Sequence, residues 1–197
     1  TVLSRYVKDH VLPSVDRALH IWRRLNPLVG LESELVQKVD VSDGYISLAG
    51  LVDDPSGLRL IGYDCLSRFL GYRVTKILTP EVSGIPVATS ISLAMNVRIA
   101  IARRGKTAGV REWISIDIDG YPEVETWYLP KNALQTRDSV LIVDDIIRTG
   151  KTVETMAGFV KMIKKAEVTG VYALVGFRKA LERLREKYRV EAVLEVV

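Results

Sequence analysis

The stretch from 139 to 152, SVLIVDDIIRTGKT, constrains the fold more than any other part of the chain. Its first five residues are apolar or small, which predicts a short strand buried on both faces, as in a parallel sheet. Two adjacent acids follow, Asp144 and Asp145, and then a polar turn that opens an apolar pattern with helical spacing. The order strand, turn, helix is the repeating unit of an α/β protein with a parallel sheet.

The polar turn consists of Arg148, Thr149, Gly150, Lys151 and Thr152. The first turn of a helix has unpaired backbone N–H groups and the positive end of the helix dipole, and both attract a phosphate. The acids would stand at the carboxyl end of the strand, where open α/β sheets bind ligands, and could accept hydrogen bonds from sugar hydroxyls. A P-loop is excluded, because it needs glycine where this chain has Asp145. The stretch therefore predicts a site for a phosphorylated sugar.

The residues VLIVDDIIRTGKT resemble the phosphoribosyl-pyrophosphate (PRPP) signature of the type I phosphoribosyltransferases. The resemblance implies an α/β fold with a Rossmann-like parallel sheet flanked by helices, a flexible β-hairpin flap and a small N-terminal hood. It implies that residues 148–152 hold the 5′-phosphate of PRPP, and that Asp144 and Asp145 are the catalytic acids beside the ribose. The implied cofactor is Mg²⁺, bound through PRPP, with the two acids as candidate ligands.

A second strand–turn–helix pattern is predicted by residues 74–79 and 87–95. The stretch VTKILTPEVSGIPVA resembles the pyrophosphate-binding loop of purine phosphoribosyltransferases, especially the xanthine and archaeal purine enzymes. The implied loop residues are Glu81, Val82, Ser83 and Gly84. A further strand is predicted over 97–102, and its end carries three cations, Arg103, Arg104 and Lys106. These cations suit a diphosphate, because the turn would lie at the same edge of the sheet as the other two loops.

The candidate base-binding residues are Phe177, Arg178 and Lys179. Phe177 could stack on a base, and Lys179 matches a lysine that 6-oxopurine enzymes use to bind the exocyclic oxygen. Arg148 stands where hypoxanthine-guanine enzymes carry a third acid, so the base proton would have to pass to a flap carboxylate. The candidates for that carboxylate are Glu112, Asp117 and Asp119. Adenine and xanthine enzymes also lack the third acid, and we slightly favour adenine over hypoxanthine, guanine and xanthine.

The chain is expected to divide into a helical segment with a hood at 1–70 and a PRPP-binding core at 71–197. Within the core, residues 107–138 are long and irregular for the connection of a βαβ unit. Alternating segments at 113–118 and 124–129 predict a β-hairpin. The resemblance implies that residues 107–138 form a flap that closes over PRPP and excludes water.

Composition bounds the environment and the partners of the chain. The single cysteine, Cys65, excludes a disulfide framework and favours a reducing cytoplasm. No apolar run approaches the ~20 residues of a membrane span, so no membrane partner is expected. The net charge of +4 is spread along the chain without a basic-aromatic run, which favours polyanionic substrates over nucleic acid.

These observations predict a cytoplasmic purine-salvage enzyme that transfers the 5-phosphoribosyl group from PRPP to a purine base. The alternative is a non-catalytic, PRPP-sensing transcriptional regulator with the same fold. Residues 1–38 are short and poor in helix-turn-helix signals, which favours the enzyme. A PRPP-synthesising enzyme is a third interpretation, disfavoured because no ATP-binding segment is recognisable. The resemblance implies a homodimer, and an amphipathic helical pattern over 1–25 is the candidate interface.

Overall fold

The computed structural model describes residues 30–42, 45–118 and 124–197, and, nearer the N-terminus, 5–6, 8, 11–14, 16–18, 20–21 and 24. The helix predicted over 1–25 falls partly on residues outside this set, so its role stays a prediction. Within the described part of the chain, none of the helices has the length and apolar character needed to cross a membrane.

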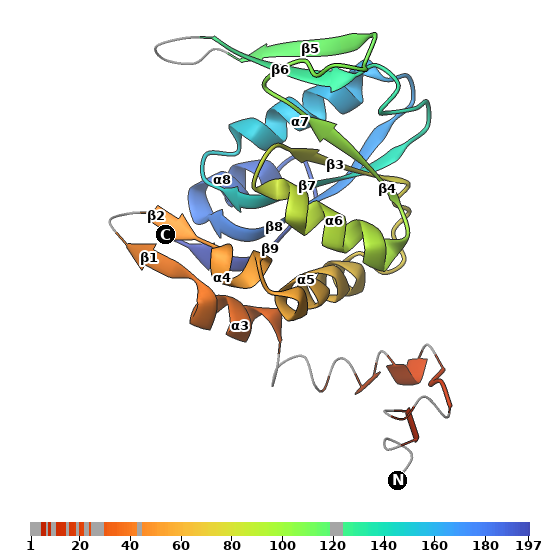
Figure 1. Ribbon diagram of the computed structural model, residues 1–197, viewed down its shortest axis with the longest axis vertical. Helices are drawn as coiled ribbons and strands as arrows, with labels where there is room; N and C mark the ends of the chain where they lie inside the picture. The colour runs from red at the N-terminus through yellow and green to blue at the C-terminus, as the bar shows by residue number, and fades with distance from the viewer. Residues whose placement is uncertain are drawn as a thin grey trace.

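A five-stranded parallel sheet forms the centre of the molecule (Figure 1). Its strands, in spatial order, are β4 (Arg98–Ala102), β3 (Lys76–Pro80), β7 (Ser139–Ile147), β8 (Glu167–Phe177) and β9 (Val190–Val196). Every neighbouring pair is parallel. β7 lies in the middle, and its residues 139–144 are all buried because helices cover both faces of the sheet. A separate antiparallel pair is formed by β1 (Asp40–Ser42) and β2 (Tyr45–Ser47). The predicted Rossmann-like sheet is confirmed.

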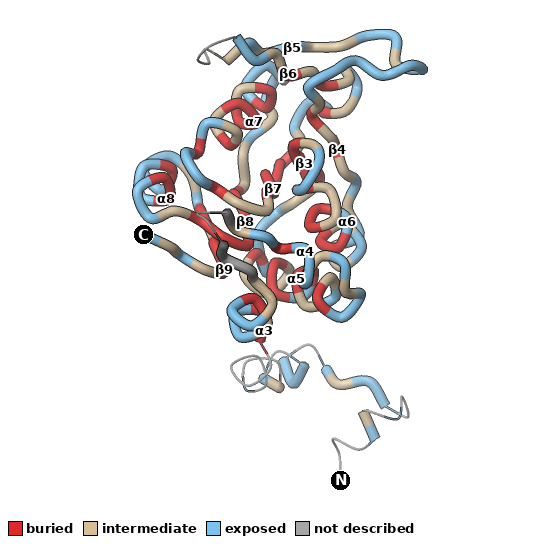
Figure 2. Tube along the Cα trace, turned by 60° about the vertical axis from the view of Figure 1, so that its left-hand side comes forward, coloured by how far each residue is buried: buried red, intermediate tan, exposed pale blue. Residues whose placement is uncertain are grey.

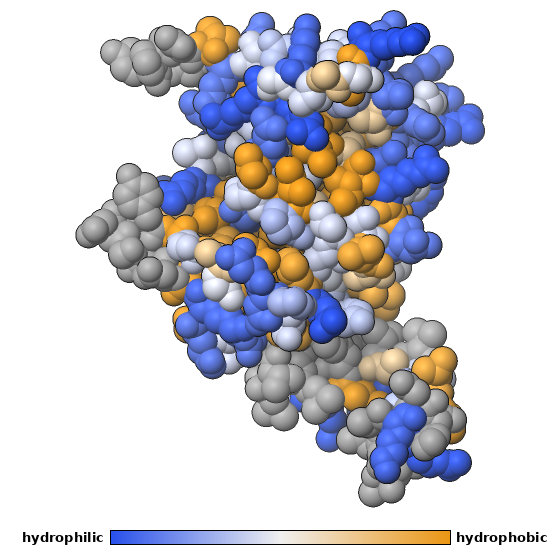
Figure 3. Space-filling model, in the orientation of Figure 1, coloured by the Kyte–Doolittle hydropathy of each residue, from blue (hydrophilic) through white to orange (hydrophobic). Residues whose placement is uncertain are grey.

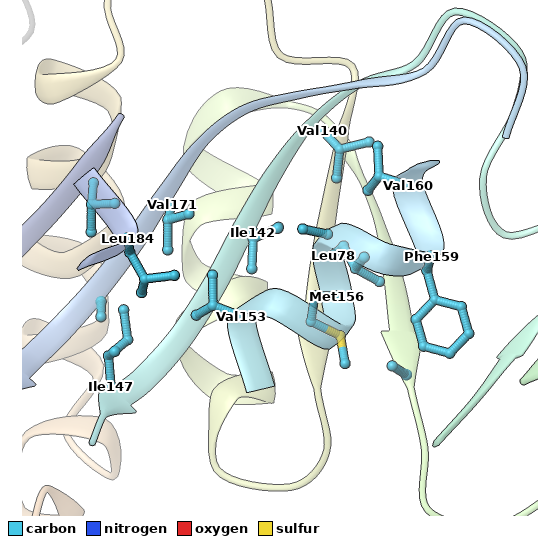
Figure 4. Packing of buried hydrophobic residues seen from close by; sticks show 14 of the residues in the cluster. Leu78, Val140, Ile142, Ile147, Val153, Met156, Phe159, Val160, Val171 and Leu184 are labelled. Carbon is cyan, nitrogen blue, oxygen red and sulfur yellow. The ribbon is translucent and has the colours of Figure 1, made fainter. Parts of the chain in front are cut away.

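The helices divide the core into two apolar clusters, one on each face of the sheet. One side holds α3 (Leu31–Lys38), α4 (Ala49–Val52), α5 (Pro55–Arg68) and α6 (Gly84–Met95), and the other holds α7 (Lys151–Met162) and α8 (Arg178–Arg185). Residues of β7 alternate between the clusters: Val140 and Ile142 join α7, whereas Leu141 and Val143 join α6. Figure 4 shows Val140 and Ile142 on the side of α7, with Val140 beside Val160. Figure 2 shows the buried residues gathered in the sheet and on the inner sides of the helices.

The predicted hairpin is formed by β5 (Trp113–Ile118) and β6 (Glu125–Pro130). It lies beside α7 (Figure 1), and a backbone bridge pairs Arg103, after β4, with Tyr128 of β6. Trp127 is buried in the cluster on the α7 side of the sheet. The hairpin is therefore packed into the core and paired with the end of β4.

Several element ends differ from the sequence prediction. β7 runs on to Ile147, because β8 pairs with it to its end, and both acids therefore lie within the strand. α6 begins at Gly84, before the helix predicted at 87–95.

Two further helices begin at residues that bear on their surroundings. α5 begins at Pro55, because Asp54 caps it by accepting the N–H of Ser56 at 3.0 Å. α8 begins at Arg178, so Arg178 and Lys179 lie in its first turn, directly after β8.

Candidate active site

The acid pair lies in the last part of β7. Asp144 is 7% exposed, and its carboxylate accepts the backbone N–H of Asp145 at 3.0 Å. Burial raises the pKa of Asp144 well above its ordinary value, and the negative charge of Asp145 raises that pKa further. Asp145 is half-buried. The pair thus combines a carboxyl group that resists ionisation with one that a ligand can reach.

The loop after β3 meets the acid pair at Gly84. β3 and β7 are adjacent parallel strands, so the loops at their carboxyl ends share one edge of the sheet. Gly84 is buried, and a methyl group in place of its hydrogen would lie 2.5 Å from Thr79 Oγ1 and 3.5 Å from Asp144 Oδ1. Glycine therefore permits this close approach. The structure brings the predicted pyrophosphate loop against the predicted catalytic acid.

The side chain of Glu81 is turned toward the end of β4. Its Oε1 accepts the backbone N–H of Arg104 at 2.7 Å, and its Oε2 accepts from Arg103 Nη1 at 3.5 Å. The peptide bond between Glu81 and Val82 is cis. Val82 and Ser83 are exposed. Because a carboxylate repels an anion, this geometry fits Glu81 as a tether between the loop and the arginines, with the exposed residues of the loop facing a ligand.

The predicted cations after β4 lie against the hairpin. Arg104 forms an ion pair with Glu125 at 3.3 Å, and its guanidinium lies 5.2 Å from the centre of the Trp127 ring. Lys106 Nζ lies 5.2 Å from the centre of the Tyr128 ring. Both cations are exposed, and Figure 3 shows hydrophilic residues covering this upper part of the molecule. They remain accessible to an anion at the edge of the sheet.

The polar turn after β7 has the geometry of an anion site. The N-cap residue of α7 is Gly150, which has no side chain to cap the helix, and Thr149 Oγ1 accepts the backbone N–H of Lys151 at 3.4 Å. The first N–H groups of a helix have no acceptor in a preceding helical turn. Gly150 has a φ of +76°, and a methyl group there would lie 3.1 Å from a leucine side chain of α8. Arg148, Thr149 and Lys151 are exposed, and Thr152 is half-buried. Backbone donors, the helix dipole and two cations therefore meet at this turn.

The predicted base-binding residues lie where β8 becomes α8. Phe177 is the last residue of β8 and is half-buried. The guanidinium of Arg148 lies 5.9 Å from the centre of the Phe177 ring, so the structure brings these two turns together. Arg178 and Lys179 are exposed in the first turn of α8.

One contact to the polar turn was not predicted from the sequence. Arg183 of α8 donates a hydrogen bond from Nη2 to the carbonyl oxygen of Thr149. In the sequence, Arg183 stands in a run of charged residues typical of a solvated helix face, and no local signal marks it. Such a contact follows from the packing of α8 beside α7, which only the structure gives.

The acid pair was also predicted to take part in binding Mg²⁺. Among the residues that the structure describes, no group of three or more His, Cys, Asp or Glu side chains could hold a metal ion. Mg²⁺ is commonly bound through one or two carboxylates together with the phosphates of a substrate. Asp144 and Asp145 are a donor set of that kind. The pair fits a Mg²⁺ ion that is bound jointly with a phosphorylated substrate.

Comparison with known proteins agrees with this geometry. The family model of the phosphoribosyl transferase domain matches residues 61–195. The probable purine biosynthesis transcriptional regulator PurR of Streptococcus pneumoniae is 27% identical over 156 residues, 78% of this chain and 56% of the regulator. The chain thus spans little more than half the length of that relative.

An enzyme and a solved structure are also similar to this chain. The xanthine phosphoribosyltransferase of Bacillus cytotoxicus is 29% identical over 151 residues, 73% of this chain and 75% of the enzyme. The crystal structure of adenine phosphoribosyltransferase from Thermoanaerobacter pseudethanolicus has the same fold. Its TM-score is 0.75 at 17% identity, and the alignment covers 84% of this chain and 99% of that one.

The family match covers more than half of the chain and includes the acid pair, the polar turn and the loop after β3. The fold agrees with the match, since the same central sheet and flanking helices occur in the adenine phosphoribosyltransferase structure. The protein therefore belongs to the phosphoribosyl transferase family.

Proposed function

We propose that the protein is a Mg²⁺-dependent purine phosphoribosyltransferase. It transfers the 5-phosphoribosyl group of PRPP to a purine base and releases a nucleoside monophosphate and pyrophosphate. The observation that carries the proposal is the approach of Gly84 to Asp144, which sets the loop after β3 beside the acid pair. PRPP needs this arrangement, because its ribose lies between a 5′-phosphate and a pyrophosphate.

Each part of the site has a role in the proposed reaction. The turn at 148–152 binds the 5′-phosphate through backbone N–H groups, hydroxyls and cations. Asp144 and Asp145 form hydrogen bonds with the ribose hydroxyls, and the charge of Asp145 favours the positive charge that develops on the sugar ring. When bound, Mg²⁺ supplies positive charge to the pyrophosphate oxygens.

The leaving pyrophosphate lies between the two remaining groups of residues. The exposed loop residues Val82 and Ser83 and the buried Gly84 offer their backbone, and Arg103, Arg104 and Lys106 offer positive charge. Glu81 holds the first two cations beside the loop. Closure of the flap over these groups would exclude water and stays a prediction.

Two observations bear on the base. Arg148 replaces the third acid, and two of the flap carboxylates proposed for the base proton are engaged elsewhere. Glu112 pairs with Lys131 at 2.9 Å, and Asp117 accepts from the Thr126 hydroxyl at 2.7 Å; Asp119 lies outside the described residues. Because Glu112 and Asp117 already have partners, neither is placed to take the proton of a 6-oxopurine, and this favours adenine as the substrate.

The residues after β8 favour the other class of purine. Arg178 and Lys179 carry hydrogen-bond donors and no acceptors. A 6-oxopurine presents an oxygen to such donors, whereas adenine presents an amino group. A 6-oxopurine is therefore the second candidate substrate.

A panel assay tests the proposal. Purified protein is incubated with PRPP, Mg²⁺ and one of adenine, hypoxanthine, guanine, xanthine or orotate, and nucleotide formation is followed by chromatography. We expect turnover of a purine and none of orotate. Adenine turnover would support the argument from Arg148, and 6-oxopurine turnover the argument from Lys179. Turnover of orotate alone would contradict the proposal.

The second candidate function is a PRPP-sensing regulator, which the similarity to PurR favours. A sensor needs the sugar-phosphate site and not the reaction. Binding of PRPP by calorimetry without turnover of any base would select this candidate over the transferase.

A further inference from the structure

The contact between α8 and the polar turn fixes one peptide group of the candidate phosphate site. Arg183 donates from Nη2 to the carbonyl oxygen of Thr149, and a methyl group on Gly150 would lie 3.2 Å from the same nitrogen. The guanidinium therefore packs directly against the peptide that joins Thr149 and Gly150. This peptide immediately precedes α7, which begins at Lys151.

The geometry of a trans peptide determines where the N–H of Gly150 points when Arg183 holds the carbonyl of Thr149. The carbonyl oxygen and the N–H of one trans peptide group point in opposite directions. Because Arg183 holds the carbonyl of Thr149 on the side of α8, the N–H of Gly150 points to the other side of the turn. With the carbonyl reversed, its oxygen would face an anion bound at the start of α7 and repel it.

We propose that Arg183 is a positioning residue for the phosphate site. It holds the Thr149–Gly150 peptide with its N–H toward the 5′-phosphate of the bound sugar, an inference that rests on the proposed function. Arg183 acts through the peptide and does not touch the reacting atoms. It also adds a positive charge behind a turn that already carries Arg148 and Lys151.

The charges near Arg183 supply a matched control. Glu154, in the first turn of α7, places a negative charge close to the site and is paired with Arg183 at 3.8 Å and with Lys187 at 3.5 Å. Arg183 and Lys187 both offset the negative charge of Glu154, but the hydrogen bond to the Thr149 carbonyl comes from Arg183. Lys187→Ala therefore removes a cation that lies just after α8 and leaves the peptide contact intact.

Arg183 contributes little to the fold itself. Its side chain is 49% exposed, and an exposed ion pair such as the one with Glu154 adds little to stability. The variant R183A should therefore fold, with a melting temperature close to that of the wild type. If it does not fold, R183M keeps the aliphatic stem beside α7 and replaces it in the test.

The test titrates each variant, in the presence of Mg²⁺, with two probes by calorimetry. Ribose 5-phosphate carries the 5′-phosphate alone, and inorganic pyrophosphate reports on the loop after β3. We expect R183A to weaken binding of ribose 5-phosphate about tenfold, as for loss of a charged hydrogen bond, and to leave pyrophosphate binding unchanged. K187A should change neither affinity by more than about twofold. R183K, which keeps the charge and one donor, should restore part of the loss.

Kinetics supply a second readout that a purely structural role would not give. If the protein turns over a purine, R183A should raise the KM for PRPP and leave kcat and the KM for the base unchanged. Equal affinity of R183A and the wild type for ribose 5-phosphate would overturn the inference. An equal loss for both probes, or an equal loss in K187A, would also overturn it. A wild-type protein that binds neither probe would contradict the proposed function, and the inference with it.

Discussion

At the scale of single residues, Asp144 shows the cost of a buried carboxyl group at a candidate active site. It is 7% exposed and lies next to a second acid, and its carboxylate accepts the backbone N–H of Asp145. Burial, followed by the charge of Asp145, raises the pKa of Asp144 well above the ordinary value of 3.8. A residue that resists ionisation in this way destabilises the folded state, and such groups are frequent at functional sites.

The variant Asp144→Asn tests that cost through its pH dependence. In the unfolded chain Asp144 loses its proton near pH 3.8, whereas the folded protein holds the proton to higher pH. The wild type therefore loses stability as pH rises from about 4 through the raised pKa, and the variant does not. We expect melting temperatures measured by circular dichroism to be equal near pH 4 and higher for the variant at pH 8.

The control for this measurement is Asp53→Asn, which changes an exposed acid after α4. Its melting temperature should follow that of the wild type at every pH. A variant Asp144→Asn that is less stable than the wild type at pH 8 would show that the ionised carboxylate stabilises the fold.

At the scale of elements, the hairpin β5–β6 combines a core position with a predicted function as a flap. Trp127 is 2% exposed and belongs to the apolar cluster on the α7 side. On the neighbouring strand, Ile116 lies so close to α7 that a methyl group on Gly158 would come within 2.9 Å of it. The body of the hairpin, formed by β5 and β6, is therefore part of the core, and closure of the flap stays a prediction.

Truncation of Trp127 tests this assignment. The indole Nε1 has no hydrogen-bond partner among the described residues, so Trp127→Ala removes core packing and the contact with Arg104 but no hydrogen bond. We expect it to lower the free energy of unfolding by about 3 kcal/mol, measured by urea denaturation. Trp113→Ala, on the half-buried side of the same hairpin, should cost less. A loss below about 1 kcal/mol for Trp127→Ala would mean that the hairpin packs loosely.

Elements with a strong local pattern could be predicted from the sequence. The parallel sheet, its flanking helices and the hairpin are all present, because buried strands and alternating segments leave a clear periodicity. The extension of β7 through both acids was not predictable, since it depends on pairing with β8, far along the chain. The contact of Arg183 with Thr149 was not predictable for the same reason. The hydrogen bond between the side chains of Arg103 and Glu81 also depends on the pairing of distant segments.

At the scale of the whole molecule, the sheet gathers parts of the candidate site that are far apart in the sequence. β3 lies between β4 and β7 in the sheet. The carboxyl end of β3 leads to the loop before Gly84, that of β4 to the cations, and that of β7 contains the acid pair. β8 adds Phe177 beside the polar turn. The division into residues 1–70 and 71–197 and the homodimer stay predictions. The family match and the position of these groups at one edge of the sheet are the two observations that support the proposed active site.

The most direct measurement compares nucleotide formation from PRPP and the preferred purine by the wild type, Asp145→Asn and the control Asp53→Asn, with melting temperatures recorded alongside. Asp145 is half-buried, so its replacement should leave the fold intact. If the end of β7 is the active site, Asp145→Asn should lower kcat by about 100-fold or more, while Asp53→Asn keeps the wild-type rate. An Asp145→Asn variant that turns over at the wild-type rate would contradict the account.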